Sequence, residues 1–172
     1  MNTKKIIKQH IVSVLVENRA GTLSRVSGLF SRRGYNIDSL TVGETEDPSI
    51  SRMTIAVTGE ERILDQIIKQ LEKLIDVIAV RGLDSCLRRE IMLVKIGADE
   101  KNRPAVLEIA GIFRTRVVDV SQSTITIEAT GSTEKLNGFL LLLKPYGILE
   151  LARTGLVALE RGANVLSAEK HS

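Results

Sequence analysis

The chain of 172 residues contains few of the side chains that most often do chemistry. It has one cysteine, two histidines, three Phe, two Tyr and no Trp. The single cysteine, Cys86, excludes a disulfide within the chain and favours a reducing compartment. The two histidines, His10 and His171, lie near the two ends, so neither is a good partner for a catalytic Cys or Ser. This composition argues against an enzyme that works by itself.

The motifs that define several other functions are also missing. No Gly-x-Gly-x-x-Gly follows a predicted strand, no Gly-rich loop ends in Lys-Ser/Thr, and no His or Cys cluster has metal-ligand spacing. The 24 Lys+Arg nearly balance the 21 Asp+Glu and form no basic stripe. The predicted strands also have almost no aromatic residues on which nucleic-acid bases could stack. We therefore expect neither a metal site nor nucleic-acid binding.

Long apolar runs are absent as well. The longest run is far below the roughly 18 residues that a membrane-spanning helix needs. The N-terminal residues 1–8 are basic, and no long apolar segment follows them, so no signal or transit peptide is expected. These features predict no membrane association and a place in the cytoplasm, or in the plastid stroma if the protein is plastid-encoded.

Aliphatic side chains recur with regular spacing in the first half of the chain. The run 11–16 is apolar on both faces and predicts a strand that is central or covered on both sides. The spacing over the first half predicts, in order, a strand at 11–16, a helix from Leu23 to a stop at Gly34, strands at 36–43 and 52–58, a helix after a capping box at Thr58–Glu61 that reaches Ile75, and a strand at 77–80. This β-α-β-β-α-β order is typical of a ferredoxin-like unit, with an antiparallel sheet and both helices on one face.

The same order then begins again after the polar stretch 83–89. The elements predicted there are a strand at 91–96, a helix opened by Pro104, a hairpin at 117–120 and 124–129, a helix from Thr133 to Pro145, and a final strand at 148–159 that Gly155 can interrupt. The predicted fold class is therefore α+β, with two tandem ferredoxin-like βαββαβ domains. We place them at residues 1–84 and 85–172.

The stretch 17–40 contains the one candidate binding site. Gly21 makes a tight turn into a helix, where free backbone N–H groups and the helix dipole favour a small anion such as a carboxylate. The side-chain amides of Asn18 and Asn36 can both accept a hydrogen bond from an ammonium group and donate one to a carboxylate. The alternative is that these residues only shape the turn and the helix exit. The second half has Ala105 in place of Gly21 and nothing like Gly34-Tyr-Asn36, so a site of this kind is expected only in the first half.

At these residues the sequence resembles an ACT domain, and more specifically the small regulatory subunits of acetohydroxyacid synthase (acetolactate synthase). The similarity extends over nearly the whole chain. Its clearest motifs are Ser13-Val-Leu-Val-Glu-Asn18, Gly21-x-Leu-Ser-Arg-Val26, Gly28-Leu-Phe-Ser-x-Arg-Gly-Tyr-Asn-Ile37, Arg89-Glu-Ile-Met-Leu-Val-Lys-Ile96 and Ala152-Arg-Thr-Gly155.

The resemblance implies a non-catalytic protein of branched-chain amino acid biosynthesis. Such a subunit binds the large catalytic subunit, raises its activity, and confers feedback inhibition by a branched-chain amino acid, usually valine. Thiamine diphosphate, magnesium and FAD belong to that catalytic partner, and no cofactor is expected in this chain. A different ACT-type amino-acid sensor, one that regulates another enzyme or a transcription factor, is the alternative.

The resemblance also implies where the effector binds. In ACT regulators it lies between two domains of a homodimer, and Leu23 and Ile37 would flank its aliphatic side chain. Carried over to this sequence, the effector-binding residues are Asn18, Ala20, Gly21, Thr22 and Leu23 of one protomer, facing Asn36 and Ile37 of the other.

Overall fold

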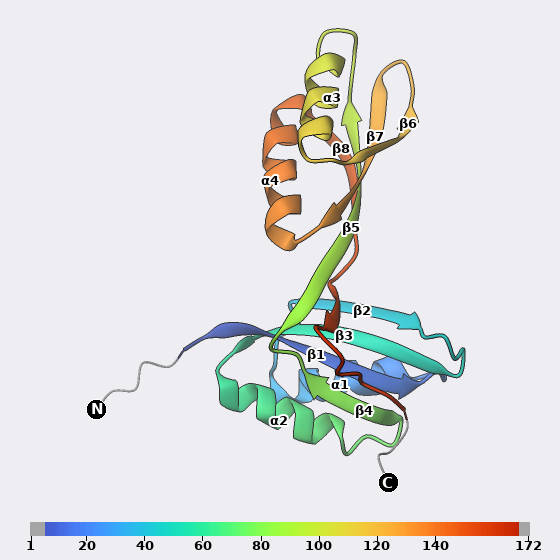
Figure 1. Cartoon of the computed structure of the whole chain (residues 1–172), viewed down its shortest axis with the longest axis vertical. Helices are drawn as coiled ribbons and strands as arrows, with labels where there is room; N and C mark the ends of the chain where they lie inside the picture. The colour runs from blue at the N-terminus through green and yellow to red at the C-terminus, as the bar shows by residue number, and fades with distance from the viewer. Residues whose placement is uncertain (1–5, 169–172) are drawn as a thin grey trace. The chain divides into compact units, whose positions relative to one another are not determined.

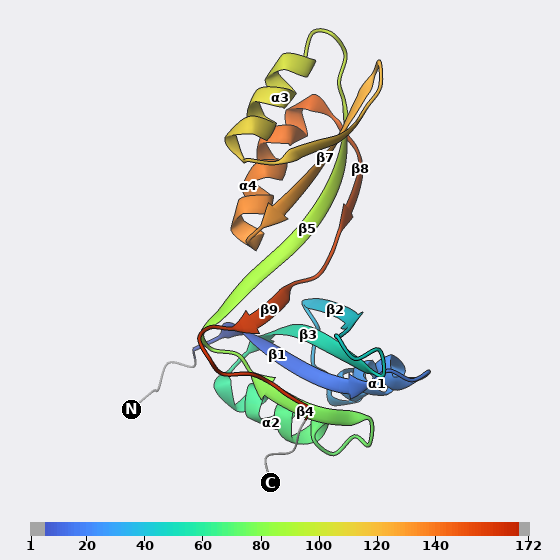
Figure 2. The ribbon, with the colours of Figure 1, turned by 45° about the vertical axis from the view of Figure 1, so that its right-hand side comes forward.

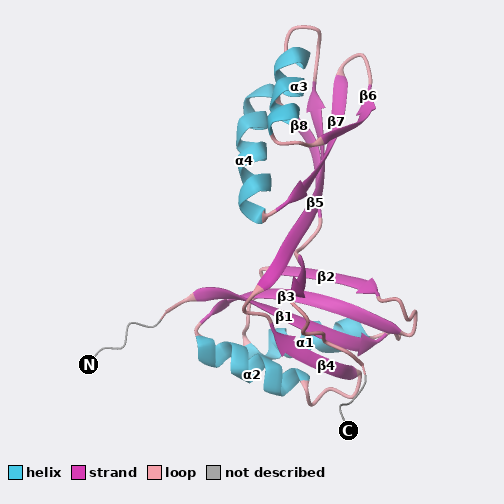
Figure 3. Cartoon of the chain, viewed as in Figure 1, coloured by secondary structure: helices cyan, strands magenta, loops and turns pink. Residues whose placement is uncertain are grey.

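The computed structural model describes residues 6–168, which divide into two compact units. Residues 88–154 form one unit, and the described residues before and after them form the other. The chain therefore leaves the first unit after Leu87 and returns to it at Gly155. In each unit two helices lie on one face of an antiparallel sheet (Figures 1 and 3). The predicted α+β class, with two ferredoxin-like βαββαβ arrangements, is confirmed.

The first unit contains a four-stranded sheet in the order β2-β3-β1-β4. Its two central strands are antiparallel, and Val14 of one lies opposite Met53 of the other. The elements are β1 (Lys8–Glu17), α1 (Thr22–Arg33), β2 (Ser39–Glu44), β3 (Ile50–Gly59), α2 (Glu61–Leu71) and β4 (Val77–Gly82). Because β2 is at the edge of this sheet, one of its sides has no partner strand among the described residues.

Strand β1 is buried on both of its faces, as the apolar run 11–16 predicts. On the helix side, Val12, Val14 and Val16 belong to the core that also contains Phe30 and Ile67. On the other side, a second cluster contains Ile11 and Ala56 of the sheet and Leu156 and Ala158 from the end of the chain. Figure 2 shows this C-terminal segment, coloured red, on the sheet face that α1 and α2 leave open.

The second unit repeats the topology with the strand order β6-β7-β5-β8. Its core packs Phe139 and Leu136 of the second helix against Met92, Val94 and Ile127 of the sheet. The elements are β5 (Cys86–Gly97), α3 (Arg103–Ile112), β6 (Arg116–Val120), β7 (Thr124–Gly131), α4 (Thr133–Leu143), a short 3-10 helix η1 (Lys144–Tyr146) and β8 (Ile148–Arg153).

Two predictions about helix α2 need correction. The capping box at Thr58 is wrong, because α2 begins at Glu61 after Glu60, and no side chain caps it. The Thr58 hydroxyl instead donates to Asp38 Oδ2 at 2.7 Å, which ties β3 to the segment before β2. The helix also ends at Leu71 rather than continuing to Ile75, whose side chain is fully open to solvent.

The ends of the second unit also differ from the prediction. The polar stretch 83–89 is not all linker, because β5 starts at Cys86. The predicted strand 148–159 is two strands, β8 and β9 (Val157–Glu160), interrupted around Gly155 as expected. They have separate roles, because β8 belongs to the second unit whereas the segment that contains β9 groups with the first. Among residues 6–168, no helix is long and apolar enough to cross a bilayer.

Candidate functional site

The turn into α1 depends on Gly21. This residue precedes the helix with φ 86° and ψ −12°, a left-handed conformation that residues with a side chain rarely adopt. The turn is closed by Thr22, whose N–H donates to Arg19 O at 3.3 Å and whose hydroxyl donates to Glu17 O at 3.2 Å. Another left-handed glycine, Gly34 with φ 70°, ends the helix. Both predicted glycine positions are thus confirmed as turn formers.

Free N–H groups remain at this helix start. The ladder of α1 begins with the bond from Arg25 N–H to Gly21 O, and no side chain caps the N-terminus. In the described part of the chain, the N–H groups of Gly21 and Leu23 have no acceptor, whereas that of Thr22 is used within the turn. The first turn contains no acidic residue, and the Leu23 side chain is 46% exposed beside it. Backbone donors and an apolar side chain are therefore presented together.

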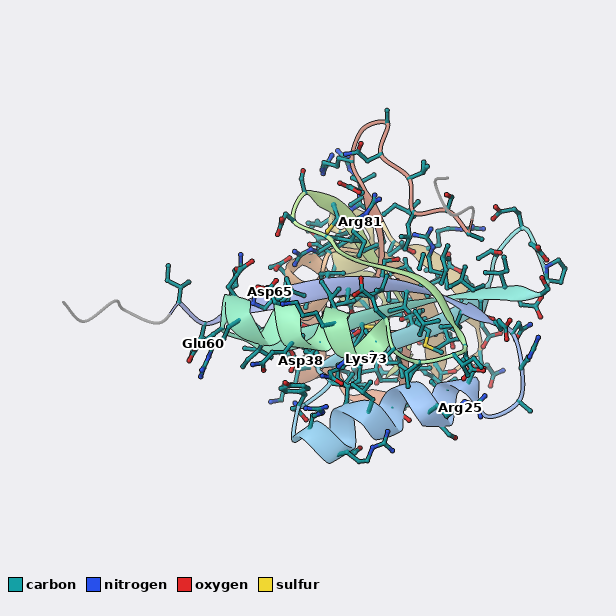
Figure 4. The ribbon with its side chains drawn as sticks, turned by 90° about the horizontal axis from the view of Figure 1, so that it is seen from below. Arg25, Asp38, Glu60, Asp65, Lys73 and Arg81 are labelled. Carbon is teal, nitrogen blue, oxygen red and sulfur yellow. The ribbon has the colours of Figure 1, made fainter. Side chains whose placement is uncertain are left out.

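An ion pair that the sequence does not predict stabilises this helix start. The Arg25 guanidinium donates from Nη2 to Asp76 Oδ1 at 2.9 Å and from Nε to the other carboxylate oxygen. Asp76 is 4% exposed, and the hydrogen bond from Arg25 holds the pKa of its carboxyl below the ordinary value. A Cβ on Gly21 would lie 2.9 Å from Arg25 Nη1, so the guanidinium covers the turn. Figure 4 shows Arg25 at the beginning of α1.

Asn18 connects the end of β1 to the loop between β2 and β3. Its backbone N–H donates to Ser49 O at 2.7 Å. Its side-chain nitrogen donates to Glu44 Oε1 at 3.0 Å and to Pro48 O at 2.9 Å. The side-chain oxygen accepts no hydrogen bond from the described residues and remains available to a donor. Asn18 is exposed, and so is Ala20 within the turn.

The other two candidate residues lie at the far end of α1. Asn36 is exposed and makes only a long hydrogen bond, 3.4 Å from its Nδ2 to Asp38 Oδ1, while Ile37 packs partly into the first core. Helix α1 has 12 residues, which corresponds to about 18 Å along its axis. Figure 4 shows Asp38 beyond the end of α1 opposite to Arg25. Within one chain, the structure thus brings Asn18 to Leu23 together and keeps Asn36 and Ile37 apart from them.

The corresponding turn of the second unit is built differently. Helix α3 begins at Arg103 after Asn102, whose φ is −99°, so no left-handed residue precedes it and Ala105 is helical. The Asn102 side chain donates to Gly97 O at 3.0 Å, and Arg103 donates to Ala98 O at 2.9 Å. These two side chains bond to carbonyl groups of the preceding loop, and no side chain caps the helix. The glycine turn is specific to the first unit.

The histidine and the cysteine of the described residues do not form a catalytic pair with the groups of the candidate site. The buried His10 lies with its Nε2 3.0 Å from Gly59 O, and Cys86 is half-buried. No group of three or more His, Cys, Asp or Glu side chains within residues 6–168 is arranged to hold a metal ion.

Comparison with known families covers both units. Residues 12–79 match the model of the AHAS small subunit-like ACT domain, and residues 89–162 match that of the small subunit of acetolactate synthase. The two matches fall on the first and second sheets, and the first includes every candidate site residue. Each half of the chain is thus matched by a different part of the same kind of protein.

Individual relatives agree over nearly their full lengths. The chain is 51% identical over 160 residues to the probable acetolactate synthase small subunit of Methanothermobacter thermautotrophicus, an alignment that covers 91% of this chain and 95% of the relative. It is 50% identical over 163 residues to the acetolactate synthase small subunit of Mycolicibacterium smegmatis, with 94% and 96% covered. The crystal structure of the small subunit from Thermotoga maritima superposes with a TM-score of 0.86 at 40% identity, covering 91% and 99%.

Fold and similarity agree on one assignment. The first unit is an ACT domain, the second is the C-terminal domain found in the same family, and the relatives match from end to end. In this family the small subunit is a non-catalytic, regulatory subunit of an enzyme of branched-chain amino acid synthesis, and the cofactors of that enzyme reside on its catalytic subunit. The chain belongs to the acetolactate synthase small subunits.

Proposed function

We propose that this chain binds valine between the ACT domains of two copies and thereby controls the large catalytic subunit. The proposed contacts are Asn18, Ala20, Gly21, Thr22 and Leu23 of one copy, and Asn36 and Ile37 of the other. The observation that supports this most is the separation of the two groups by the length of α1, about 18 Å for its 12 residues. An amino acid is much shorter than that, so one chain alone could not surround it with both groups.

The helix start suits the polar end of an amino acid. The free N–H groups of Gly21 and Leu23 would donate to the carboxylate, which also gains from the positive end of the helix dipole. The side-chain oxygens of Asn18 and Asn36 would accept from the ammonium group. The exposed Leu23 and the half-buried Ile37 would contact the isopropyl group. The carboxylate of the ligand would thus meet hydrogen-bond donors, and its ammonium group would meet acceptors.

The edge strand β2 is suited to pairing with the same strand of a second copy. Its outer side has free backbone groups, and a twofold axis would pair it with the β2 of a second copy in antiparallel fashion. In such a pair, Ser39 at the start of one strand lies near Glu44 at the end of the other. Glu44 accepts a hydrogen bond from Asn18, and Ile37 comes two residues before Ser39. The same pairing would therefore bring Asn36 and Ile37 of one copy towards the Asn18 turn of the other.

Regulation follows if valine binds one arrangement of the dimer better than another. A ligand with equal affinity for both arrangements could not change the activity of the partner. A coupling of about 1–3 kcal/mol between effector and catalytic subunit is the usual scale for such control. In this proposal the ACT domain, predicted at residues 1–84, binds the effector, and the second unit, residues 88–154, serves regulation. The small subunit raises the activity of the large one in the cytoplasm, and valine reduces it.

Titration calorimetry with valine, leucine and isoleucine tests the proposal directly. We expect heat from valine binding, followed by valine inhibition when the chain is combined with its catalytic subunit. Sedimentation should show at least a dimer. Binding of none of the three amino acids, together with activity of the combined enzyme that valine does not change, would refute the proposed effector.

A further inference from the structure

The C-terminal segment 155–168, here called the strap, lies over the open face of the first sheet (Figure 2). It brings Leu156 and Ala158 into a buried cluster with Ile11, Ala56 and Leu83 of the sheet and its margin. Without the strap, these residues of the sheet would be exposed to water. The strap is therefore an integral layer of the ACT domain, although about 70 residues of the other unit precede it in the sequence.

The beginning of the strap touches the edge strand β2. The N–H of Leu156 donates to the Ser39 hydroxyl at 2.8 Å. The residue before it, Gly155, lies so close to β2 that a side chain does not fit. A Cβ there would be 2.6 Å from Ser39 Oγ, 2.6 Å from Thr41 Oγ1 and 2.8 Å from the backbone oxygen of Leu40, whereas an ordinary contact begins near 3.4 Å.

The remainder of the strap is fastened to strands other than β2. Glu160 forms an ion pair with Arg81 of β4, with 2.9 Å between Oε2 and Nη1. Arg52 of β3 donates from Nη2 to Leu166 O at 3.3 Å. The strap thus crosses from the edge strand β2 to β4 by Glu160 and returns to β3 at Leu166. Its buried residues, Leu156 and Ala158 near the beginning, hold it against the sheet.

We propose that Gly155 and Leu156 are positioning residues for the effector site, because they fix β2 and with it the Asn36–Ile37 half. Ile37 and Leu40 anchor this part of the chain from the helix side, and the strap contacts it from the open side. Asn36 and Ile37 precede Ser39 by only three and two residues, so a displacement of Ser39 moves them as well. This inference rests on the proposed function, since it concerns the same valine site.

The substitution Gly155→Ala tests the inference. Its Cβ forces β2 or the strap to move by more than half an ångström, which is enough to lengthen hydrogen bonds beyond their working range. We expect the dissociation constant for valine to rise about tenfold or more, which is about 1.4 kcal/mol. Ser39→Ala removes the acceptor of the Leu156 N–H without adding an atom, and it should raise the constant in the same direction, by about threefold. This second variant keeps the test informative if Gly155→Ala does not fold.

The matched control is Glu160→Gln, which breaks the ion pair at the β4 end of the strap and leaves the contact with β2 in place. Its dissociation constant for valine should stay within about twofold of the wild type. Hydrogen exchange distinguishes a positioning role from a purely structural one. If the strap were only structural, valine would not change the exchange rates of its amides. In the wild type, valine should slow the exchange of the Leu156 amide, because the effector fixes β2 and β2 holds that amide.

The possible outcomes separate the two proposals. If the wild-type protein does not bind valine, the proposed function fails. If the wild type binds valine but folded Gly155→Ala and Ser39→Ala bind it with the wild-type constant, only the positioning role is overturned. A Leu156 amide whose exchange does not respond to valine in the wild type would also overturn that role. Weakened binding in both variants with Glu160→Gln unchanged supports it.

Discussion

The substitution Gly21→Asp places a negative charge where the proposed site receives the carboxylate of valine. Gly21 comes directly before α1, and its own free N–H is one of the proposed donors. Two carboxylates about 4 Å apart repel each other by about 1 kcal/mol in water and by about 4 kcal/mol at the lower effective dielectric near a protein surface. We therefore expect the affinity for valine to fall between about 5-fold and about 1,000-fold.

The same substitution has a structural cost that must be measured separately. A residue with a side chain at φ 86° costs about 1–2 kcal/mol. The new Cβ also comes within 2.9 Å of Arg25 Nη1, which is the movable end of a side chain that is paired with Asp76. Because domains of this size are stable by about 5–15 kcal/mol, the variant should remain folded. Its activation of the catalytic subunit should therefore persist.

The assay is inhibition of the combined enzyme over a range of valine concentrations, together with calorimetry of the small subunit alone. The second unit supplies the matched control, Ala105→Asp, which adds the same charge to the first turn of α3, where the preceding residue is not left-handed. That variant should bind valine and be inhibited like the wild type. A folded Gly21→Asp protein that valine still inhibits at wild-type concentrations would refute the placement of the ligand carboxylate.

Two further predictions concern stability. Arg25 lowers the pKa of Asp76, so this carboxylate stabilises the fold above its ordinary pKa of about 4, and the contribution is lost as the pH falls through the folded value. Urea unfolding between pH 6 and pH 3 should therefore show a smaller loss of stability with acid for Asp76→Asn than for the wild type; equal pH profiles would contradict the ion pair. Phe139 is fully buried in the second core, so Phe139→Ala should cost about 3–5 kcal/mol, whereas Leu141→Ala on the exposed face of the same helix should cost within about 0.5 kcal/mol. Equal costs by urea unfolding would mean that α4 packs by another face.

The two sheets could be predicted because each element has its own period in the sequence. Helical spacing from Leu23 to Gly34 reflects one buried face. The alternation in 52–58 reflects the large apolar side chains of Met53, Ile55 and Val57 on the helix side, although β3 is buried on its other face as well. The strap could not be predicted, because β9 continues the extended pattern of β8 and nothing local shows that this segment packs on the first sheet. The doubly apolar run 11–16 indicated that something covers the second face, but not which segment does so.

The candidate site could be predicted only in part, for a similar reason. Gly21 and Gly34 could be found because a left-handed turn needs glycine, and the structure has both in that conformation. Arg25 and Asp76 are 51 positions apart in the sequence. The spacing of charges along one helix therefore could not predict their ion pair. The way in which Asn36 and Ile37 join the turn depends on a second copy, and the sequence could suggest it only through resemblance to a family.

In the proposed arrangement each valine site is shared between two copies, and a mixed dimer distinguishes this from a site within one copy. One copy carries Gly21→Asp, the other carries Asn36→Ala, and the heterodimer is purified through two different tags. Each substitution should weaken valine binding at both sites of its own homodimer. In the heterodimer, however, both substitutions fall in the same site if the halves come from different copies, and the other site is intact.

Calorimetry should then find about one valine per heterodimer with wild-type affinity, against about two per wild-type dimer. A heterodimer that binds valine no more tightly than its two parent homodimers would contradict the shared site.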